Sequence, residues 1–194
     1  MARKRKSCIE RALGMLSRRA YSVFEVRSKL SQYGYEDDEI AKTIERLQGL
    51  DYLDDEQFTR AWVRYRAEIS GWGPRRILMD LKQKGVDESL AQTALAAWEA
   101  LEDEKRDTFA PLMVDKEAER GKSVWHENAE DLLHNKFGPW PEGLKELSGL
   151  VEWEEKQAHY KAVQKEKARR LNFLLRRGFN HDEAMTALEK VMNG

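Results

Sequence analysis

The chain has 194 residues, and 34 basic and 35 acidic side chains leave a formal net charge of only −1 although 36% of the residues are charged. A single cysteine, Cys8, excludes an internal disulfide, and no apolar run is long enough to cross a bilayer. Four prolines, few β-branched runs and the high charge favour solvated helices in a reducing cytoplasm. We therefore expect an all-α, cytoplasmic protein.

A basic N-terminal arm, residues 1–8, precedes a first predicted unit of three helices. The first helix stops near Ser17, Ser22 and Glu25 form a capping box for the second, and Gly34 ends it. The third helix opens on the acidic residues 36–39, whose charges suit a helix N-terminus. Apolar residues at helical spacing predict the inward faces: Ile9, Leu13, Leu16, Val23, Val26, Leu30, Ile40, Ile44 and Leu47.

A second unit begins at another capping box, Asp54 to Gln57, and repeats the first at an offset of 51 residues. Its first helix is predicted to bury one apolar stripe, made of Phe58, Trp62, Tyr65 and Ile69. The turn Gly71-Trp72-Gly73-Pro74 follows, in which Pro74 suits the first position of the next helix. The side chains of three residues on that helix are predicted to face inward: Ile77, Leu78 and Leu81. The helix is predicted to end at Gly85.

A third copy of the unit ends the chain, because residues 174–179 match residues 30–35. Asn180 and Glu183 supply its capping box, and its inward face is predicted from Ala184, Leu188 and Val191. The glycines of the second and third copies, Gly85 and Gly178, lie 93 residues apart, so this copy carries an insertion of roughly forty residues. Within the insertion we expect a helix over 128–137, a turn over 138–143, and a packed cluster of three tryptophans, Trp125, Trp140 and Trp153.

The predicted fold is therefore all-α, with three tandem three-helix repeats and a helical insertion before the last half-repeat. The boundaries are a basic arm over 1–8, the first repeat over 9–53, the second over 54–99, an acidic linker and Trp-rich insertion that includes the first helix of the third repeat over 100–158, and the rest of that repeat over 159–194.

Charge follows the repeats. Basic side chains outnumber acidic ones nine to two over 1–29, seven to two over 60–84 and seven to one over 161–177, whereas residues 36–57 hold nine acidic and two basic side chains. Any single charge is best interpreted as part of a solvated face with salt bridges between helices. The recurrence in phase with the repeat favours a continuous basic strip that binds an anion or an acidic protein.

Seven segments of the chain together match the pattern of a known family: Ser17-Arg18-Arg19, 25–30, Gly34-Tyr35, 52–58, 71–77, 81–86 and 174–179. The combination of Tyr-Leu-Asp-Asp-x-x-Phe with Gly-x-Gly-Pro-x-Arg-Ile is specific, whereas no single piece would be. On these motifs the chain resembles the RecX family of bacterial recombination regulators. The resemblance covers about 9–98 closely and about 160–191 more loosely.

The resemblance implies an elongated, curved array of three three-helix repeats that binds RecA recombinase filaments on DNA. It further implies that the protein limits the strand exchange, ATPase and coprotease activities of RecA in DNA repair and the SOS response. DNA would be contacted weakly or through RecA, and we expect a monomer without a catalytic centre, cofactor, metal or membrane contact. The predicted strip facing RecA or DNA comprises Arg18, Arg19, Arg27, Lys29, Arg64, Arg66, Arg75, Arg76, Lys82, Lys84, Arg176 and Arg177.

Two other classes of function compete with this one. A stand-alone DNA-binding protein is the first, because Arg75 and Arg76 lie at a helix N-terminus in a unit close to a helix-turn-helix. An enzyme is disfavoured, because no phosphate-binding loop is present and the four histidines lack metal-ligand spacing: His126, His134, His159 and His181. Cys8 is expected to serve packing.

Overall fold

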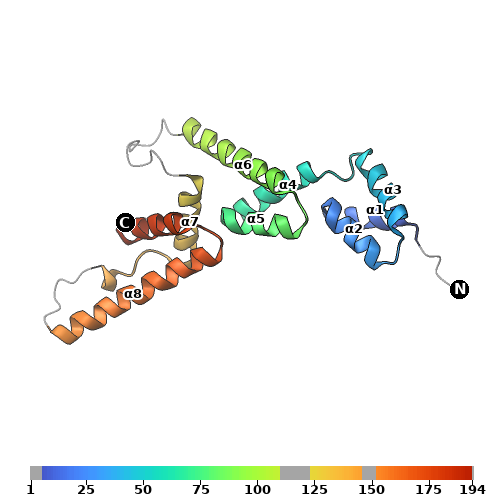
Figure 1. Ribbon diagram of the computed structural model, residues 1–194. Coiled ribbons are helices and arrows are strands. Elements are labelled where there is room, and N and C mark those ends of the chain that lie inside the picture. Colours follow the sequence, from blue (N-terminus) through green and yellow to red (C-terminus); the bar gives the residue numbers. More distant parts are fainter. Residues whose placement is uncertain (1–5, 110–122, 146–151, 194) are drawn as a thin grey trace. The chain divides into compact units, whose positions relative to one another are not determined.

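The computed structural model describes residues 6–109, 123–145 and 152–193, and every regular element within those residues is helical (Figure 1). The elements are α1 (Cys8–Leu16), α2 (Val23–Gln32), α3 (Asp37–Gln48), α4 (Asp55–Arg64), a π-helical turn (Tyr65–Ile69), α5 (Pro74–Gln83), α6 (Glu88–Phe109), α7 (Val124–Phe137), a 3-10 turn (Glu142–Leu144), α8 (Trp153–Arg176) and α9 (His181–Asn193). The all-α fold class is confirmed. None of these helices combines the length and the apolar character needed to cross a bilayer.

The chain divides into two compact units. The N-terminal unit comprises residues up to Arg64 together with Leu78–Ala96, and the C-terminal unit comprises Tyr65–Ile77 and residues from Ala97 onward. Most of the predicted basic arm lies outside the described residues, and Cys8, assigned to the arm, already begins α1.

In the N-terminal unit, α1, α2 and α3 pack on one another around a single core. The predicted capping box of Ser22 and Glu25 is present on α2. The predicted inward face of α1 is wrong at Leu13, which is 38% exposed. Three other side chains of α1 enter the core instead, Cys8, Ala12 and Met15, and burial raises the pKa of the Cys8 thiol, as suits a packing residue.

Four helices end in the same backbone turn, in which one residue adopts a left-handed conformation and the next N–H returns to a carbonyl five residues earlier. The left-handed residues are Gly34, Asp51, Gly85 and Gly178. The returning bonds join Tyr35 to Leu30, Tyr52 to Leu47, Val86 to Leu81 and Phe179 to Leu174, at 2.9–3.3 Å. The predicted glycine stops at Gly34 and Gly85 are therefore confirmed, Gly178 matches them as the third copy of the unit does, and Asp51 is the non-glycine member of the set.

The predicted stripe along α4 is only half correct. Phe58 is buried and Trp62 half-buried, but Tyr65 is 49% and Ile69 73% exposed. The reason is the π-helical turn, which has more residues per turn than an α-helix and so changes which side chains face inward. The buried face runs instead through Thr59, Val63 and Ala67. At the start of α4, the carboxylate of the predicted cap Asp54 accepts the Gln57 N–H at 3.1 Å.

In the C-terminal unit, α7, α8 and α9 pack on one another as α1, α2 and α3 do. The first helix of the third repeat is therefore α7, which lies inside the predicted insertion. The additional residues are distributed among several elements, since α6 has 22 residues against 12 in α3, and α8 has 24 against 10 in α2. The capping box on α9 is confirmed: the Asn180 N–H donates to Glu183 at 2.7 Å, and the Glu183 N–H donates to Asn180 at 2.8 Å.

The predicted cluster of three tryptophans is wrong. Trp153 is 71% exposed, whereas Trp125 and Trp140 are each 2% exposed. Trp125 packs against Trp98, with ring centroids 4.8 Å apart, so its main aromatic neighbour comes from the preceding repeat. Helical spacing cannot reveal such a partner.

Candidate functional site

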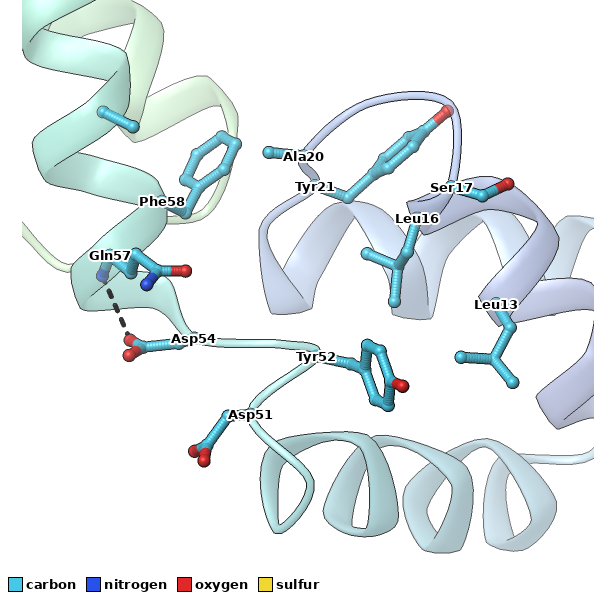
Figure 2. A pocket seen from close by; sticks show the side chains of 11 residues that line it. Leu13, Leu16, Ser17, Ala20, Tyr21, Asp51, Tyr52, Asp54, Gln57 and Phe58 are labelled. Atoms are coloured by element: carbon cyan, nitrogen blue, oxygen red, sulfur yellow. Dashed lines mark hydrogen bonds between the residues drawn. The ribbon is translucent and has the colours of Figure 1, made fainter.

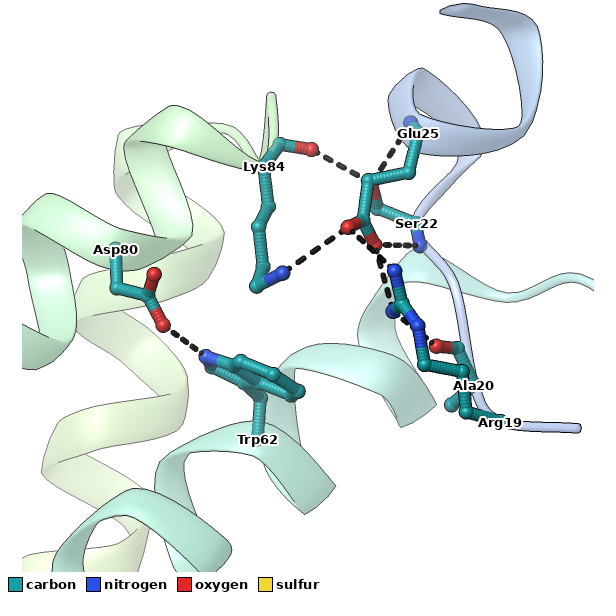
Figure 3. Close-up of polar contacts among 7 residues, drawn as sticks. All are labelled: Arg19, Ala20, Ser22, Glu25, Trp62, Asp80 and Lys84. Carbon is teal, nitrogen blue, oxygen red and sulfur yellow. Dashed lines mark hydrogen bonds and ion pairs between the residues drawn. The ribbon is translucent and has the colours of Figure 1, made fainter. Parts of the chain in front are cut away.

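Neighbouring repeats are joined through their second helices. The N-terminus of the second helix in one repeat meets the C-terminus of the second helix in the following repeat. In the N-terminal unit, α2 meets α5 in this way (Figure 3). The Ser22 hydroxyl donates to the Lys84 carbonyl at 2.6 Å, and the Lys84 ammonium donates to Glu25 at 3.0 Å. The Arg19 guanidinium reaches the same carboxylate at 3.1 Å. Two predicted strip residues, Arg19 and Lys84, therefore stabilise this junction internally.

The charge of Glu25 is held in place by these donors. Burial acts to raise the pKa of the Glu25 carboxyl, but hydrogen bonds from Arg19, Lys84 and the Ser22 N–H outweigh it, so the pKa lies below its usual range. A carboxyl with a lowered folded-state pKa adds stability above its unfolded pKa, and this stability is lost as the pH falls through the folded pKa.

Replacing Lys84 by methionine is therefore expected to destabilise the protein by about 1 kcal/mol at pH 7. The difference from wild type should shrink as the pH falls from the ordinary glutamate pKa toward the lowered pKa of Glu25 in the folded wild type, because the carboxylate becomes protonated over that range. Urea denaturation at a series of pH values measures this. Asp55 also faces Glu25, and burial raises the pKa of Asp55. Wild type and the Lys84 variant both contain Asp55, so its effect on stability cancels in the comparison. The exposed neighbour Lys82, changed to methionine, is the control, and an equal loss there would contradict the assignment.

The C-terminal unit contains the equivalent junction, between the start of α5 and the end of α8. The Gly73 N–H donates to the Arg177 carbonyl at 2.8 Å, and the Arg75 N–H donates to the Gly178 carbonyl at 3.2 Å. The Arg76 guanidinium donates to the Arg176 carbonyl at 3.1 Å. The backbone of the turn around Gly73 is thus hydrogen-bonded to the backbone of the Arg176-Arg177-Gly178 turn, and the bonded residues lie 103 or more positions apart.

Beside this junction lies an arginine-lined cleft of about 450 Å³. It is formed by α8, the end of α7 and the start of α5. Its lining residues are Arg76, Phe137, Arg169, Asn172, Phe173, Arg176 and Arg177. Four guanidinium groups and one amide therefore surround a single space, and no carboxylate is among these described lining residues.

Aromatic faces and backbone carbonyls hold several of these guanidinium groups in position. Arg177 donates to the Ser70 carbonyl at 2.6 Å and lies 5.0 Å from the centre of the Phe173 ring. Arg76 lies 4.1 Å from the centre of Trp72, and Arg66 lies 3.9 Å from the same ring. Such contacts restrict the side chains before any ligand arrives, so less conformational entropy is lost on binding.

Arg169, also in the cleft, lies 4.7 Å from the Phe137 ring and forms an ion pair with Glu166 at 3.3 Å. By contrast, Arg76, Arg176 and Arg177 form no ion pair with any carboxylate in the described part of the chain. Their charge is therefore available to an external anion. Guanidinium groups bind phosphate or carboxylate oxygens in a two-pronged geometry, so the cleft suits either.

The twelve predicted strip residues fall into three groups. Arg76, Arg176 and Arg177 meet at the cleft, with Arg66 beside them on Trp72. Arg19 and Lys84 meet on Glu25. The others are spread over exposed or half-buried positions of their helices and loops: Arg18, Arg27, Lys29, Arg64, Arg75 and Lys82. A single strip that joins all twelve stays a prediction.

Sequence reasoning missed two polar cleft residues, Arg169 and Asn172, and the aromatic side chains beside them. A signal was present, because Arg169, Phe173 and Arg177 follow one another at intervals of four and so share a helix face. No such signal exists for Phe137, which reaches the cleft from α7 and contacts Phe173 edge to face at 5.3 Å.

Metal ligation was disfavoured from the sequence, and this stays a prediction. In the described ranges, no three histidine, cysteine, aspartate or glutamate side chains gather as a metal site would require. His126 instead lies 3.7 Å from Asp182 and hydrogen-bonds with Ser123 at 3.1 Å.

In comparisons with known proteins, two segments of the chain match the models of two domain families. Residues 8–47 match "RecX, first three-helix domain", and residues 54–95 match "RecX, second three-helix domain". A "Regulatory protein RecX" from Xanthomonas oryzae pv. oryzae (strain MAFF 311018) is 32% identical over 151 residues, covering 77% of this chain and 79% of that protein.

Two further proteins show how far the similarity extends. A "Regulatory protein RecX" from Prosthecochloris aestuarii is 36% identical over 95 residues, or 49% of this chain, and this match spans 63% of that protein, less than two thirds of its length. The structure described as "Crystal structure of RecX from Lactobacillus salivarius" aligns with a TM-score of 0.60 and 21% identity, covering 95% of this chain and 94% of that one. At this identity the likeness concerns the fold.

Proposed function

The chain belongs to the RecX family of regulatory proteins, and from this membership we propose that it binds RecA recombinase filaments on DNA and mainly inhibits them. The affected activities would be strand exchange, ATP hydrolysis and coprotease function, in DNA repair and the SOS response. The protein would act in the cytoplasm as a monomer, by binding alone and without a cofactor.

The observation that carries this proposal is the arginine-lined cleft. Three of its arginines have no ion-pair partner among the described residues: Arg76, Arg176 and Arg177. They come from two repeats whose backbones are hydrogen-bonded to each other. A filament of a recombinase on DNA offers both phosphates and protein carboxylates in a repeating arrangement. A rigid, positively charged site suits such a polymer, because several weak contacts to neighbouring protomers add their free energies.

Arg176 lines the cleft, and Arg75 lies at the junction beside it, where its N–H donates to the Gly178 carbonyl. Changing both to glutamate is expected to weaken inhibition of the RecA ATPase at least tenfold. Both side chains are exposed, and their own hydrogen bonds within the described residues involve only backbone atoms, so helicity and melting temperature should be unchanged. Titration of RecA filaments on single-stranded DNA with each protein measures the effect.

The matched control changes Lys42 and Arg46 to glutamate. These are exposed residues of α3 outside the strip, and the change in net charge is the same. Inhibition that survives in the Arg75 and Arg176 variant, or is lost equally in the control, would refute the role of the cleft and the junction beside it.

A stand-alone DNA-binding function is the alternative, favoured by Arg75 at the N-terminus of α5. Gel shifts without RecA separate the two functions. Tight, sequence-selective binding of the wild-type chain would support the alternative, and weak, salt-sensitive binding would support the RecA-dependent function.

A further inference from the structure

The motif Tyr-Leu-Asp-Asp-x-x-Phe, residues 52–58, has no role in the arginine-lined cleft, but it forms much of a groove in the N-terminal unit (Figure 2). The groove has a volume of about 570 Å³ and lies between the end of α1, the loop after it and the start of α4. Its apolar lining consists mainly of Leu13, Leu16, Ala20, Tyr21, Tyr52 and Phe58.

The motif residues divide into two kinds. Leu53 is 3% exposed and belongs to the core, and the Asp55 carboxylate accepts the Val23 N–H at 2.8 Å. Tyr52, by contrast, is 61% exposed and leans over the groove opposite Leu13, which is 38% exposed. Apolar surface gathered around a concavity and left in water is typical of a contact site for a protein.

The charge of the groove is the reverse of that of the cleft. Its charged lining residues are Asp51 and Asp54, both exposed at its edge. The Asp54 carboxylate accepts the N–H groups of Glu56 at 2.7 Å and Gln57 at 3.1 Å, which caps α4. Two carboxylates repel a nucleic-acid backbone, so this groove is unsuited to DNA and suited to a partner that carries a cation.

Asp51 lies at a position that local backbone preference would give to glycine. Its φ is 57°, and it occupies the left-handed place that glycine fills in the other three turns of this kind. An aspartate tolerates this conformation less well than a glycine does. Aspartate is one of the few non-glycine residues that adopt this conformation, so the carboxylate at the groove edge is a candidate for a functional role.

We propose that this groove binds one apolar side chain of a partner protein that has a lysine or arginine within one or two residues of it. The apolar side chain fills the space between Leu13, Tyr52 and Phe58, and the cation pairs with Asp51. The inference rests on the proposed function for the choice of partner, which is a protomer of the recombinase filament. In this proposal the N-terminal unit makes the contact with the partner protein, whereas the arginine-lined cleft makes the contact with an anion.

The first test compares two groove variants with a matched control for binding to RecA filaments assembled on single-stranded DNA. Tyr52→Ala removes the exposed ring and should weaken binding about tenfold. Tyr160→Ala is the control, because Tyr160 is exposed to nearly the same extent, 64% against 61%, but lies on α8. That variant should bind as wild type does.

Asp51→Gly gives a sharper result, because its two expected effects have opposite signs. Glycine relieves the left-handed residue, so the melting temperature should be unchanged or raised. Loss of the carboxylate should nevertheless weaken filament binding several-fold. A fall in melting temperature together with unchanged binding would overturn the role given to Asp51.

A photo-crosslinking residue in place of Gln57, which lines the groove and is exposed, identifies the bound segment directly. The crosslinked RecA peptide should contain an apolar residue beside a lysine or arginine. Crosslinks to DNA, or to a peptide without that pattern, would overturn the inference.

If wild type fails to bind filaments, the proposed function is wrong, and so is the choice of RecA as the partner of the groove. If wild type binds and the Tyr52 and Asp51 variants bind equally well, the groove assignment alone fails.

Discussion

Replacing Arg170 by leucine is expected to destabilise the C-terminal unit by about 3–5 kcal/mol, because it removes one partner of a buried ion pair. Arg170 is only 1% exposed. Its guanidinium donates to Glu166 at 2.9 Å and to the carbonyls of Gly138 and Pro139 at 3.1 and 3.0 Å. It thereby fastens the turn after α7 to the last third of α8. Leucine would leave a carboxylate and two carbonyls without these donors.

Glu166 shows how strongly the pair is coupled. Burial acts to raise the pKa of its carboxyl, but hydrogen bonds from Arg170 and Arg169 outweigh it, so the pKa lies below the usual range. Urea denaturation monitored by the tryptophan fluorescence measures the loss of stability. Arg169→Leu is the matched control, because that neighbouring side chain is 64% exposed and should lose little. A loss in Arg170→Leu no greater than in the control would show that the buried bonds do not hold the turn.

Gly73→Ala is expected to have the second-largest effect, a loss of about 1–3 kcal/mol or more. A Cβ atom at this position would lie 2.5 Å from Gly178 C and 2.5 Å from Phe179 N. Both atoms are backbone, so neither can move aside as a flexible side chain would. The junction would have to open, and the hydrogen bond from Gly73 to the Arg177 carbonyl, 2.8 Å long, would be stretched or lost.

Because the arginine-lined cleft is built on this junction, Gly73→Ala should also weaken filament inhibition. Gly14→Ala provides a control with the opposite sign. A Cβ at Gly14 meets nothing within 4 Å, and the residue lies within α1, so alanine should stabilise by about 0.5–1 kcal/mol. Thermal melts of both variants measure the pair of effects. Equal shifts in the same direction would exclude close backbone approach as the reason for glycine at position 73.

Much of the helical framework follows from local signals in the sequence. The capping boxes at Ser22 and Asn180 and the stops at Gly34, Gly85 and Gly178 depend only on residues a few positions apart. Backbone conformation and side-chain caps act over that same range, so these features are predictable without knowledge of the packing. The repeat itself is visible for the same reason, because each copy carries its own local signals.

The candidate site was predictable only in its chemistry. The sequence shows an excess of arginine and lysine in three segments, and it indicates that several of these side chains lie on helices. It does not show that Arg19 and Lys84 turn inward to Glu25, or that Arg170 is buried. These outcomes depend on carboxylates and carbonyls that other helices supply.

The sequence by itself determined an all-helical chain, its three repeated units and the charge of each segment. Only the tertiary structure decided which face of α1 is buried, how the π-helical turn redirects Tyr65 and Ile69, and which arginines meet in one cleft. The physical reason is the distance along the chain over which the deciding contacts act. The contact of Arg177 with Ser70 joins residues 107 positions apart, and no local periodicity carries information about such a pair.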